Sequence, residues 1–149
     1  MDINIILQIR QFRACEVEER NGEIIISGEL KDSEKHCPHC NTLAIKPHQY
    51  RQKRLRTIPF NGKPTYLIFT HRSYLCDRCG RKFLERTDFF EKQRRYTIAY
   101  EEYIYETTKG RDMERAAAQE KLNWHTINDI FLKGREKKAG EKKGAAKNS

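Results

Sequence analysis

The sequence lacks the long apolar runs, the leader and the repeats that mark several classes of protein. The largely apolar stretch at residues 3–9 is short and has no basic residues before it. No run approaches the roughly 20 apolar residues that a membrane-spanning helix requires, and no internal repeat recurs at a useful period. These absences predict a cytoplasmic protein with no membrane partner.

The sequence also has little apolar material for its size. Its 149 residues are 37% hydrophobic and 34% charged, which is enough for one ordinary domain or two small ones. Such a composition provides no single large core. Small units with little core need another source of stability, of which a structural metal is one.

Negative charge is scarce where positive charge is dense. The chain has a net charge of +9 and a sequence pI of about 9.4. The net charge is −4 in residues 1–34, +11 in residues 35–95 and +2 in residues 96–149. This concentration of positive charge favours a polyanionic partner, and nucleic acid is a better candidate than an anionic membrane. Ordinary solvated lysines and arginines are the alternative interpretation.

Four of the five cysteines form two C-x-x-C pairs, Cys37 with Cys40 and Cys76 with Cys79. In a cytosolic protein this spacing is more typical of metal sites than of disulfides. Four thiolates fill a closed tetrahedral Zn²⁺ site and leave no position open for hydrolytic chemistry. Buried structural cysteines or a redox dithiol are the alternatives.

The neighbours of the cysteines agree with two zinc knuckles. Such a turn needs a residue that tolerates positive φ after its second cysteine, and Asn41 and Gly80 meet that need. His36 and His39 are possible substitute ligands, but beside and inside a knuckle they are expected to face solvent. The unpaired Cys15 is expected to be a small buried apolar residue of a strand.

Strand patterns occupy the first two thirds of the chain. Residues 12–20 and 23–30 predict a hairpin joined by Asn21-Gly22, which suits a type I′ turn. Residues 48–58 and 65–75 predict two further strands. The prolines in the link at residues 59–64 are expected to stop both of them. Residues 1–10 fit a strand or a short helix.

Helical patterns begin at residue 97. Thr97 is a candidate N-cap for a first helix that ends near Gly110. A second helix, Met113–Lys121, follows Asp112 as its cap. A third, Trp124–Lys133, follows Asn123 and is expected to end at Gly134. The short link between the last two helices favours a helix-turn-helix or a plain helical hairpin.

These patterns predict an α+β fold. Residues 1–95 form a β-hairpin and an expanded zinc ribbon of antiparallel strands with two C-x-x-C knuckles, and residues 96–134 form a three-helix segment. Residues 135–149 consist mostly of Lys, Ala, Gly and Glu with nothing to bury, which predicts a disordered basic tail.

Candidate nucleic-acid contacts lie on the second predicted hairpin, around the second knuckle and at the start of the third helix. The cations are Arg51, Lys53, Arg54, Arg56, Arg72, Arg78, Arg81 and Lys82; their density suits tracking of phosphates. His125, Thr126, Asn128 and Asp129 occupy positions that would meet base edges in a major groove. Tyr50, Tyr66 and Tyr74 interleave with the cations; packing is the more common role for such tyrosines, and base stacking the alternative.

The combined motif string resembles a known family. It consists of Cys37-Pro38-His39-Cys40, the run HQYRQKRLRTIP at 48–59, the run RSYLCDRCGRKF at 72–83 and NWHTI at 123–127. Over about residues 12–135 it looks like the N-terminal part of insertion-sequence transposases of the ISL-three family. Those proteins begin with a zinc-binding domain and a helix-turn-helix and continue with a DDE catalytic domain. The family usually has a glycine where this chain has Lys121.

The resemblance implies one structural Zn²⁺ on Cys37, Cys40, Cys76 and Cys79. It also implies that the basic hairpin and the helix from Trp124 bind double-stranded DNA at transposon terminal inverted repeats. No DDE domain follows residue 135, so the chain is expected to be a truncated or stand-alone DNA-binding module without catalysis. Full-length transposase is a possible partner and the nucleoid a possible location. A zinc-ribbon module for protein–protein interaction or transcriptional regulation, and more weakly a redox enzyme, are the alternatives.

Overall fold

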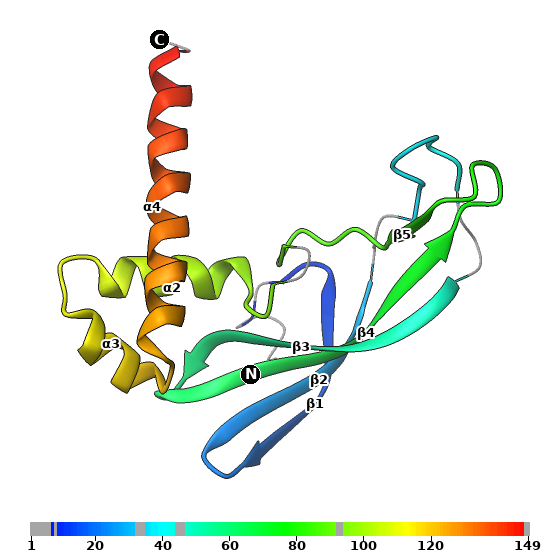
Figure 1. Cartoon of the computed structure of the whole chain (residues 1–149). Helices are drawn as coiled ribbons and strands as arrows, with labels where there is room; N and C mark the ends of the chain where they lie inside the picture. The colour runs from blue at the N-terminus through cyan, green and yellow to red at the C-terminus, as the bar shows by residue number, and fades with distance from the viewer. Residues whose placement is uncertain (1–6, 8, 32–34, 44–46, 92–93, 148–149) are drawn as a thin grey trace. The chain divides into compact units, whose positions relative to one another are not determined.

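The computed structural model divides into two compact units, Met1–Thr97 and Ile98–Ser149 (Figure 1). The structure describes residues 7, 9–31, 35–43, 47–91 and 94–147. The expectation for residues 1–10 falls largely outside the described residues. In the part that is described, no helix is both long and apolar enough to cross a membrane.

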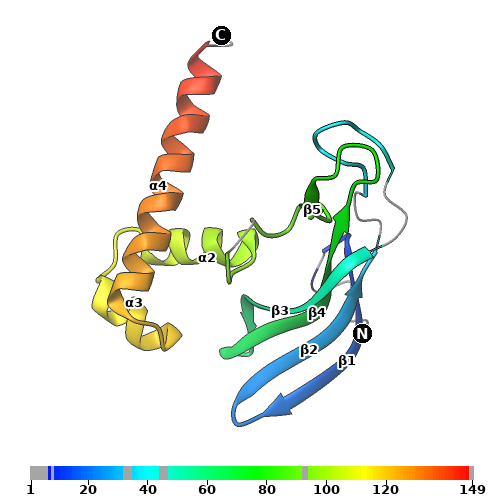
Figure 2. The same cartoon turned by 45° about the vertical axis from the view of Figure 1, so that its right-hand side comes forward.

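The first unit is a mixed sheet built from two hairpins. Its strands are β1 (Phe12–Arg20), β2 (Glu23–Leu30), β3 (Pro47–Phe60), β4 (Lys63–Leu75) and the short β5 (Lys82–Leu84). The order is β1-β2-β4-β3, with β5 also paired to β4 (Figure 2). Each hairpin is antiparallel, but β2 and β4 run parallel from Ile24 opposite Thr65 to Ser27 opposite Ile68. The expectation of antiparallel strands holds within each hairpin but not for the pairing of β2 with β4.

Both hairpins close on Asn-Gly turns. Asn21 and Gly22 have φ of 53° and 77°, and Asn61 and Gly62 have 52° and 70°, as the type I′ turn requires. The expectation that the prolines of residues 59–64 stop both strands is wrong, because β3 and β4 continue to the turn. Pro59 is tolerated because it lies on an edge strand, within the register shift between Thr57 and Phe60.

The core of the first unit lies on one face of the sheet. It joins residues of β1, β2, β3 and β4 to aromatic residues from the segment after β5. The buried members are Phe12, Ile26, Leu55, Leu67, Phe69, Phe89 and Phe90. Because side chains alternate across a strand, the residues between these members point to the opposite face of the sheet.

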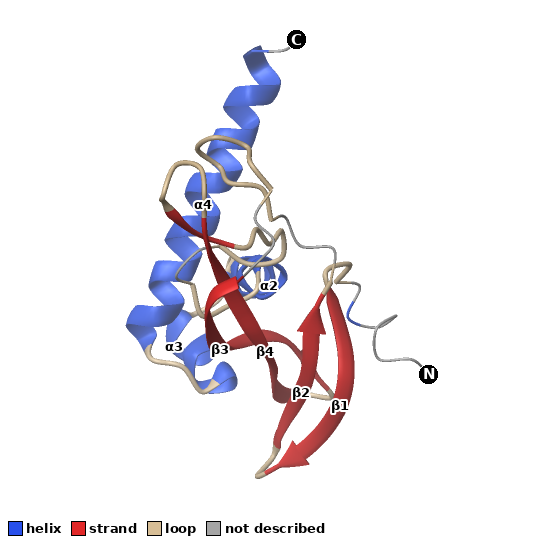
Figure 3. Cartoon of the chain, turned by 90° about the vertical axis from the view of Figure 1, so that its right-hand side faces the viewer, coloured by secondary structure: helices blue, strands red, loops and turns tan. Residues whose placement is uncertain are grey.

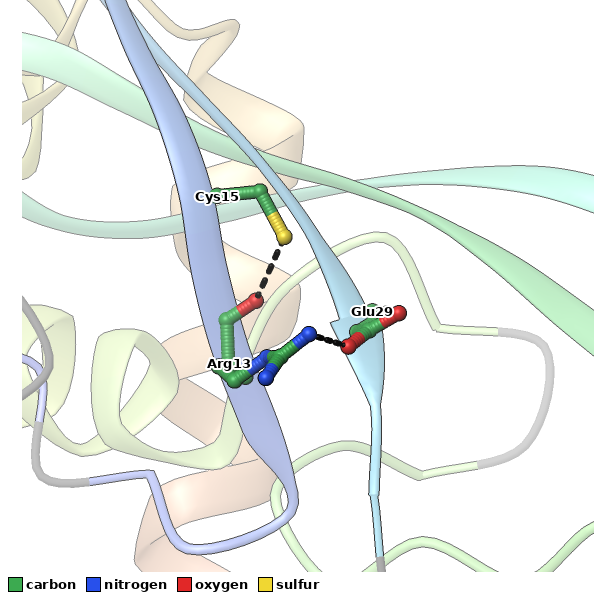
Figure 4. A network of polar contacts seen from close by, with 3 residues as sticks. All are labelled: Arg13, Cys15 and Glu29. Atoms are coloured by element: carbon green, nitrogen blue, oxygen red, sulfur yellow. Dashed lines mark hydrogen bonds and ion pairs between the residues drawn. The ribbon is translucent and has the colours of Figure 1, made fainter.

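The expectation that Cys15 is buried is wrong. Its thiol is exposed and donates to the carbonyl oxygen of Arg13 at 3.7 Å, beside the ion pair of Arg13 with Glu29 (Figure 4). The physical reason is a bulge: the register of β1 with β2 shifts between Ala14 and Glu16. Cys15 is therefore the extra residue of an edge strand, outside the alternation that would bury it.

The second unit consists of α2 (Ile98–Thr108), α3 (Met113–Glu120) and α4 (Trp124–Lys147), coloured blue in Figure 3. Asp112 accepts from the amide of Glu114 at 3.0 Å and Asn123 from that of His125 at 2.8 Å. Two of the three predicted N-caps, Asp112 and Asn123, are thereby confirmed. The helices share a small core of Tyr100, Ile104, Ala117, Ile127 and Ile130.

A buried polar contact adds to this core. The hydroxyl of Tyr100 donates to Oε1 of Glu120 at 2.8 Å, which joins α2 to the end of α3. The ring of Tyr105 stacks on that of Phe131 at 5.3 Å. A Cβ at Gly134 would lie 2.9 Å from Tyr105, so glycine at this position permits the close approach of α4 to α2.

The expectation that Gly134 ends the last helix is wrong, since α4 continues to Lys147. The structure thus gives a helical backbone to most of the segment that the sequence predicted to be disordered. Lys, Ala and Glu dominate that segment and are strong helix formers. A helix already nucleated by packing can propagate through them without burying a face.

The turn between α3 and α4 contains a strained residue. Lys121 adopts the left-handed conformation with φ 55° and ψ 40°. The amide of Leu122 donates to the carbonyl of Ala117 at 2.9 Å, and that of Lys121 to Ala118 at 3.3 Å. This is the Schellman pattern, in which glycine is the usual residue at the left-handed position. The missing glycine therefore leaves the turn geometry unchanged and costs conformational energy.

We expect Lys121→Gly to stabilise the second unit by about 1 kcal/mol, because glycine has no Cβ penalty at positive φ. Thermal or denaturant unfolding of the full chain measures the change. Gly110→Ala is the matched control with the opposite sign, since Gly110 has φ +76° and open space around its Cβ position. A loss of stability in Lys121→Gly would show that the lysine side chain contributes more than its backbone costs.

Candidate metal centre and nucleic-acid surfaces

The two knuckles have the same backbone geometry. The amide of Asn41 donates to the carbonyl of Cys37 at 2.8 Å, and that of Gly80 donates to Cys76 at 2.8 Å. Asn41 has φ 61° and Gly80 has φ 73°, so the predicted need for positive φ is confirmed in both turns. The amide of His39 also points at Sγ of Cys37, at 3.4 Å.

The four sulfurs surround one point. The Sγ atoms of Cys37, Cys40, Cys76 and Cys79 all lie within 4.8 Å of one another. The distance is 3.6 Å from Cys37 to Cys79 and 3.3 Å from Cys40 to Cys76. Zn–S bonds of about 2.3 Å in a tetrahedron place sulfurs about 3.8 Å apart. The donor set therefore fits one structural Zn²⁺.

The thiols cannot easily ionise together without a cation. Hydrogen bonds with the hydroxyl and the backbone of Thr42 lower the pKa of Cys40 to about 6. At Cys79 the hydrogen bond from the Arg81 amide lowers the pKa, but burial and the neighbouring thiols outweigh it and raise the pKa to about 11. A divalent cation at the centre would balance the crowded negative charge. Nothing in the spacing of the sequence indicated this role of Thr42.

A small aromatic core lies beneath the sulfurs. Tyr74 stacks on Phe83 with ring centroids 5.6 Å apart, and both pack against buried Cys37 and Cys76. Burial raises the pKa of the Tyr74 hydroxyl. Tyr74 is therefore a packing residue, as predicted, and it joins β4 to the metal centre.

The histidines of the first knuckle lie outside the sulfur cluster. His39 is exposed, and its Nδ1 lies 2.9 Å from Nη1 of Arg81, which links the two knuckles. His36 is exposed and forms an isolated bridge with Leu43. Among the described residues, the four cysteines are the only group of three or more His, Cys, Asp or Glu side chains close enough to hold one metal ion.

The predicted basic residues of β3 and β4 do not share one face. Arg51 and Lys53 lie on the core side of β3, where the ammonium of Lys53 is 5.5 Å from the ring centroid of Phe90. Burial and then Arg95 lower the pKa of Lys53. Arg54, Arg56 and Arg72 lie on the opposite side.

The remaining cations differ in exposure. Arg56 is buried, with 6% of its surface exposed, so its guanidinium is not displayed as the sequence suggested. Arg72 is half-buried and Arg54 is exposed. Arg78, Arg81 and Lys82 are exposed in the second knuckle and at the start of β5.

The predicted base-reading residues occupy the first two turns of α4. His125 and Asp129 are exposed, while Thr126 and Asn128 are half-buried. Trp124, 42% exposed, contacts the ring of His125 edge-on at 5.4 Å. Ile127 and Ile130 are buried on the other side of the helix and hold it to the unit.

Comparison with known families gives two matches. Residues 33–79 match the family described as zinc-finger of transposase IS204/IS1001/IS1096/IS1165. Residues 85–134 match the family described as helix-turn-helix domain of transposase family ISL3. The first match covers the whole metal centre, and the second covers all of α2 and α3 with the first part of α4. No curated protein and no solved structure matches the chain.

Proposed function

The chain belongs to transposase family ISL3, of which it carries the zinc-finger and helix-turn-helix domains, and we propose that it recognises the terminal inverted repeats of its element in double-stranded DNA. The observation that carries the proposal is the capped α4, which presents His125 and Asn128 on the side opposite buried Ile127 and Ile130. In a helix-turn-helix, residues at this place meet base edges in the major groove.

The proposal includes three finer statements. The chain by itself does not cut DNA, it resides in the cytoplasm with the nucleoid, and it can occupy repeat ends in competition with full-length transposase. Incubation with plasmid carrying the element ends and Mg²⁺ tests the first statement. Nicked or linear product that disappears with a Cys76→Ser variant would contradict it.

We expect Asn128→Ala to weaken binding to the inverted-repeat duplex by about 5- to 150-fold, which is the loss of affinity typical of removing one bidentate base contact. Binding to a scrambled duplex of the same composition should change little. Fluorescence anisotropy at several salt concentrations measures both affinities, since phosphate contacts appear in the salt slope. Glu106→Ala, at an exposed position of α2, is the control. Equal affinity of the unaltered chain for both duplexes would contradict sequence recognition.

The division of the cations between two faces favours a second candidate. A zinc-ribbon module that binds another protein, such as polymerase or transposase, needs no continuous basic surface. The protein-binding function would be favoured if the unaltered chain bound no duplex at low salt while its zinc content remained one ion per chain.

A further inference from the structure

The outer face of the β3–β4 hairpin combines aromatic and basic residues on the side of the sheet away from the larger apolar core. The register places Tyr50 opposite Arg72, Arg54 opposite Ile68 and Arg56 opposite Tyr66. These pairs alternate with Leu55, Leu67 and Phe69, which lie in the core, so all three pairs point to the other side. We call this surface the outer face.

Two positions on the outer face could stack a nucleic-acid base. Tyr50 is 62% exposed, an unusual exposure for a strand aromatic with no role at the surface. The guanidinium of Arg54 lies 4.0 Å from the ring centroid of Tyr66 and is itself exposed. The ring thus covers part of the guanidinium, while 56% of the Arg54 side chain stays exposed. Tyr50 and Arg54 are four residues apart, or about 13 Å along the strand.

The charge of this surface suits a phosphate chain. The outer face holds Arg54 and half-buried Arg72, and the described residues of β3 and β4 add no carboxylate to it. Two carboxylates contact residues of this face: Oε1 of Glu85 accepts from the backbone amide of Arg72 at 2.8 Å, and Oε2 of Glu23 of β2 is 3.4 Å from Nη2 of Arg54. The ion pair of Arg54 with Glu23 is exposed and therefore weak enough to yield to a phosphate. Exposed Gln52 and Thr70 lie between the two stacking positions and can donate hydrogen bonds.

We propose that the outer face binds single-stranded nucleic acid, with bases stacked on Tyr50 and on the Arg54–Tyr66 pair. A duplex hides its base faces inside the stack and offers only edges and phosphates. An exposed aromatic ring and an exposed guanidinium plane among cations therefore fit an unpaired strand better than a duplex. The proposal shares with the proposed function only the class of partner, and it needs no contact from α4.

The test uses the zinc-loaded full chain and a fluorescein-labelled oligo-dT of about 12 nucleotides, within the site sizes of single-strand binders. We expect Tyr50→Ala to weaken binding of the single strand by about 5- to 100-fold, the loss typical of one stacked base. Tyr50→Phe keeps the aromatic plane and should bind as the unaltered chain does. Duplex affinity should be the same in all three proteins.

A matched pair of cation variants tests the geometry. Arg54→Ala removes a cation from the outer face, and Arg51→Ala removes one from the same strand on the opposite face. We expect the first to weaken single-strand binding several-fold more than the second. Both side chains are exposed, so both variants should fold, which their zinc content and melting temperature check.

Two results would overturn the proposal. One is equal loss in Arg54→Ala and Arg51→Ala, which would show a diffuse charge effect. The other is Tyr50→Ala binding the single strand as tightly as Tyr50→Phe. Failure here is distinct from failure of the proposed function, because Asn128→Ala reports on duplex recognition by α4 and should leave single-strand binding unchanged.

Discussion

Replacing Cys76 by serine is expected to abolish stoichiometric zinc binding and to unfold both knuckles with the adjoining end of β4. Cys76 is buried, and its sulfur lies 3.3 Å from that of Cys40 on the other knuckle. Among the residues that the structure describes, the aromatic core beneath the sulfurs holds only Tyr74 and Phe83 besides the cysteines. In small zinc domains the metal contributes about 10–16 kcal/mol of apparent binding free energy, which is also folding free energy.

Native mass spectrometry measures the zinc content, and hydrogen exchange measures protection of the knuckle amides. The amides of Asn41 and Gly80 should lose protection together, since each closes its own knuckle. Those of β1 and β2 should lose less, because a separate apolar core holds these strands. Lowering the pH should release the metal, because protons compete for the thiolates. The knuckle amides should then lose more protection than those of β1 and β2.

Cys15→Ser is the matched control, because this exposed cysteine lies on β1, outside the sulfur cluster. It should retain one zinc ion and the full thermal stability. If Cys76→Ser also retained both, the four sulfurs would not be the site of a structural metal.

Gly28→Ala is expected to destabilise the first unit by about 3 kcal/mol. A Cβ at this position would lie 2.3 Å from the carbonyl oxygen of Arg13 and 2.5 Å from Cζ of Phe12. The oxygen belongs to the backbone of β1 next to its bulge, so it cannot move without loss of strand pairing. Overpacking of this kind typically costs 1–3 kcal/mol, and more where backbone must shift.

Chemical denaturation of the zinc-loaded chain measures the loss. Ser27→Ala, at the neighbouring position of β2, should change stability much less because it adds no atoms. Gly140→Ala, where a Cβ would meet nothing within 4 Å, is a second control and should be neutral or stabilising. A Gly28→Ala protein as stable as the unaltered chain would show that the bulge accommodates a side chain at little cost.

Local patterns predicted the elements of this chain because their causes are local. Asn-Gly turns, N-caps at Asp112 and Asn123 and positive-φ residues after each second cysteine all act within a few residues. The helix boundary predicted at Gly134 failed because the role of this glycine is set by a residue distant in the chain. Glycine ends a helix only when the chain turns there, and at this position it instead accommodates Tyr105.

The sequence by itself determined the four metal ligands, the two hairpins and the capped helices, since spacing and residue type specify them. Only the tertiary structure decided the rest. The parallel pairing of β2 with β4 joins the two hairpins into one sheet, and strand alternation within that sheet separates Arg51 and Lys53 from Arg54 and Arg72. The bulge in β1 likewise exposes Cys15. Which face of a strand meets a core depends on partners distant in the chain, and no local pattern encodes that choice.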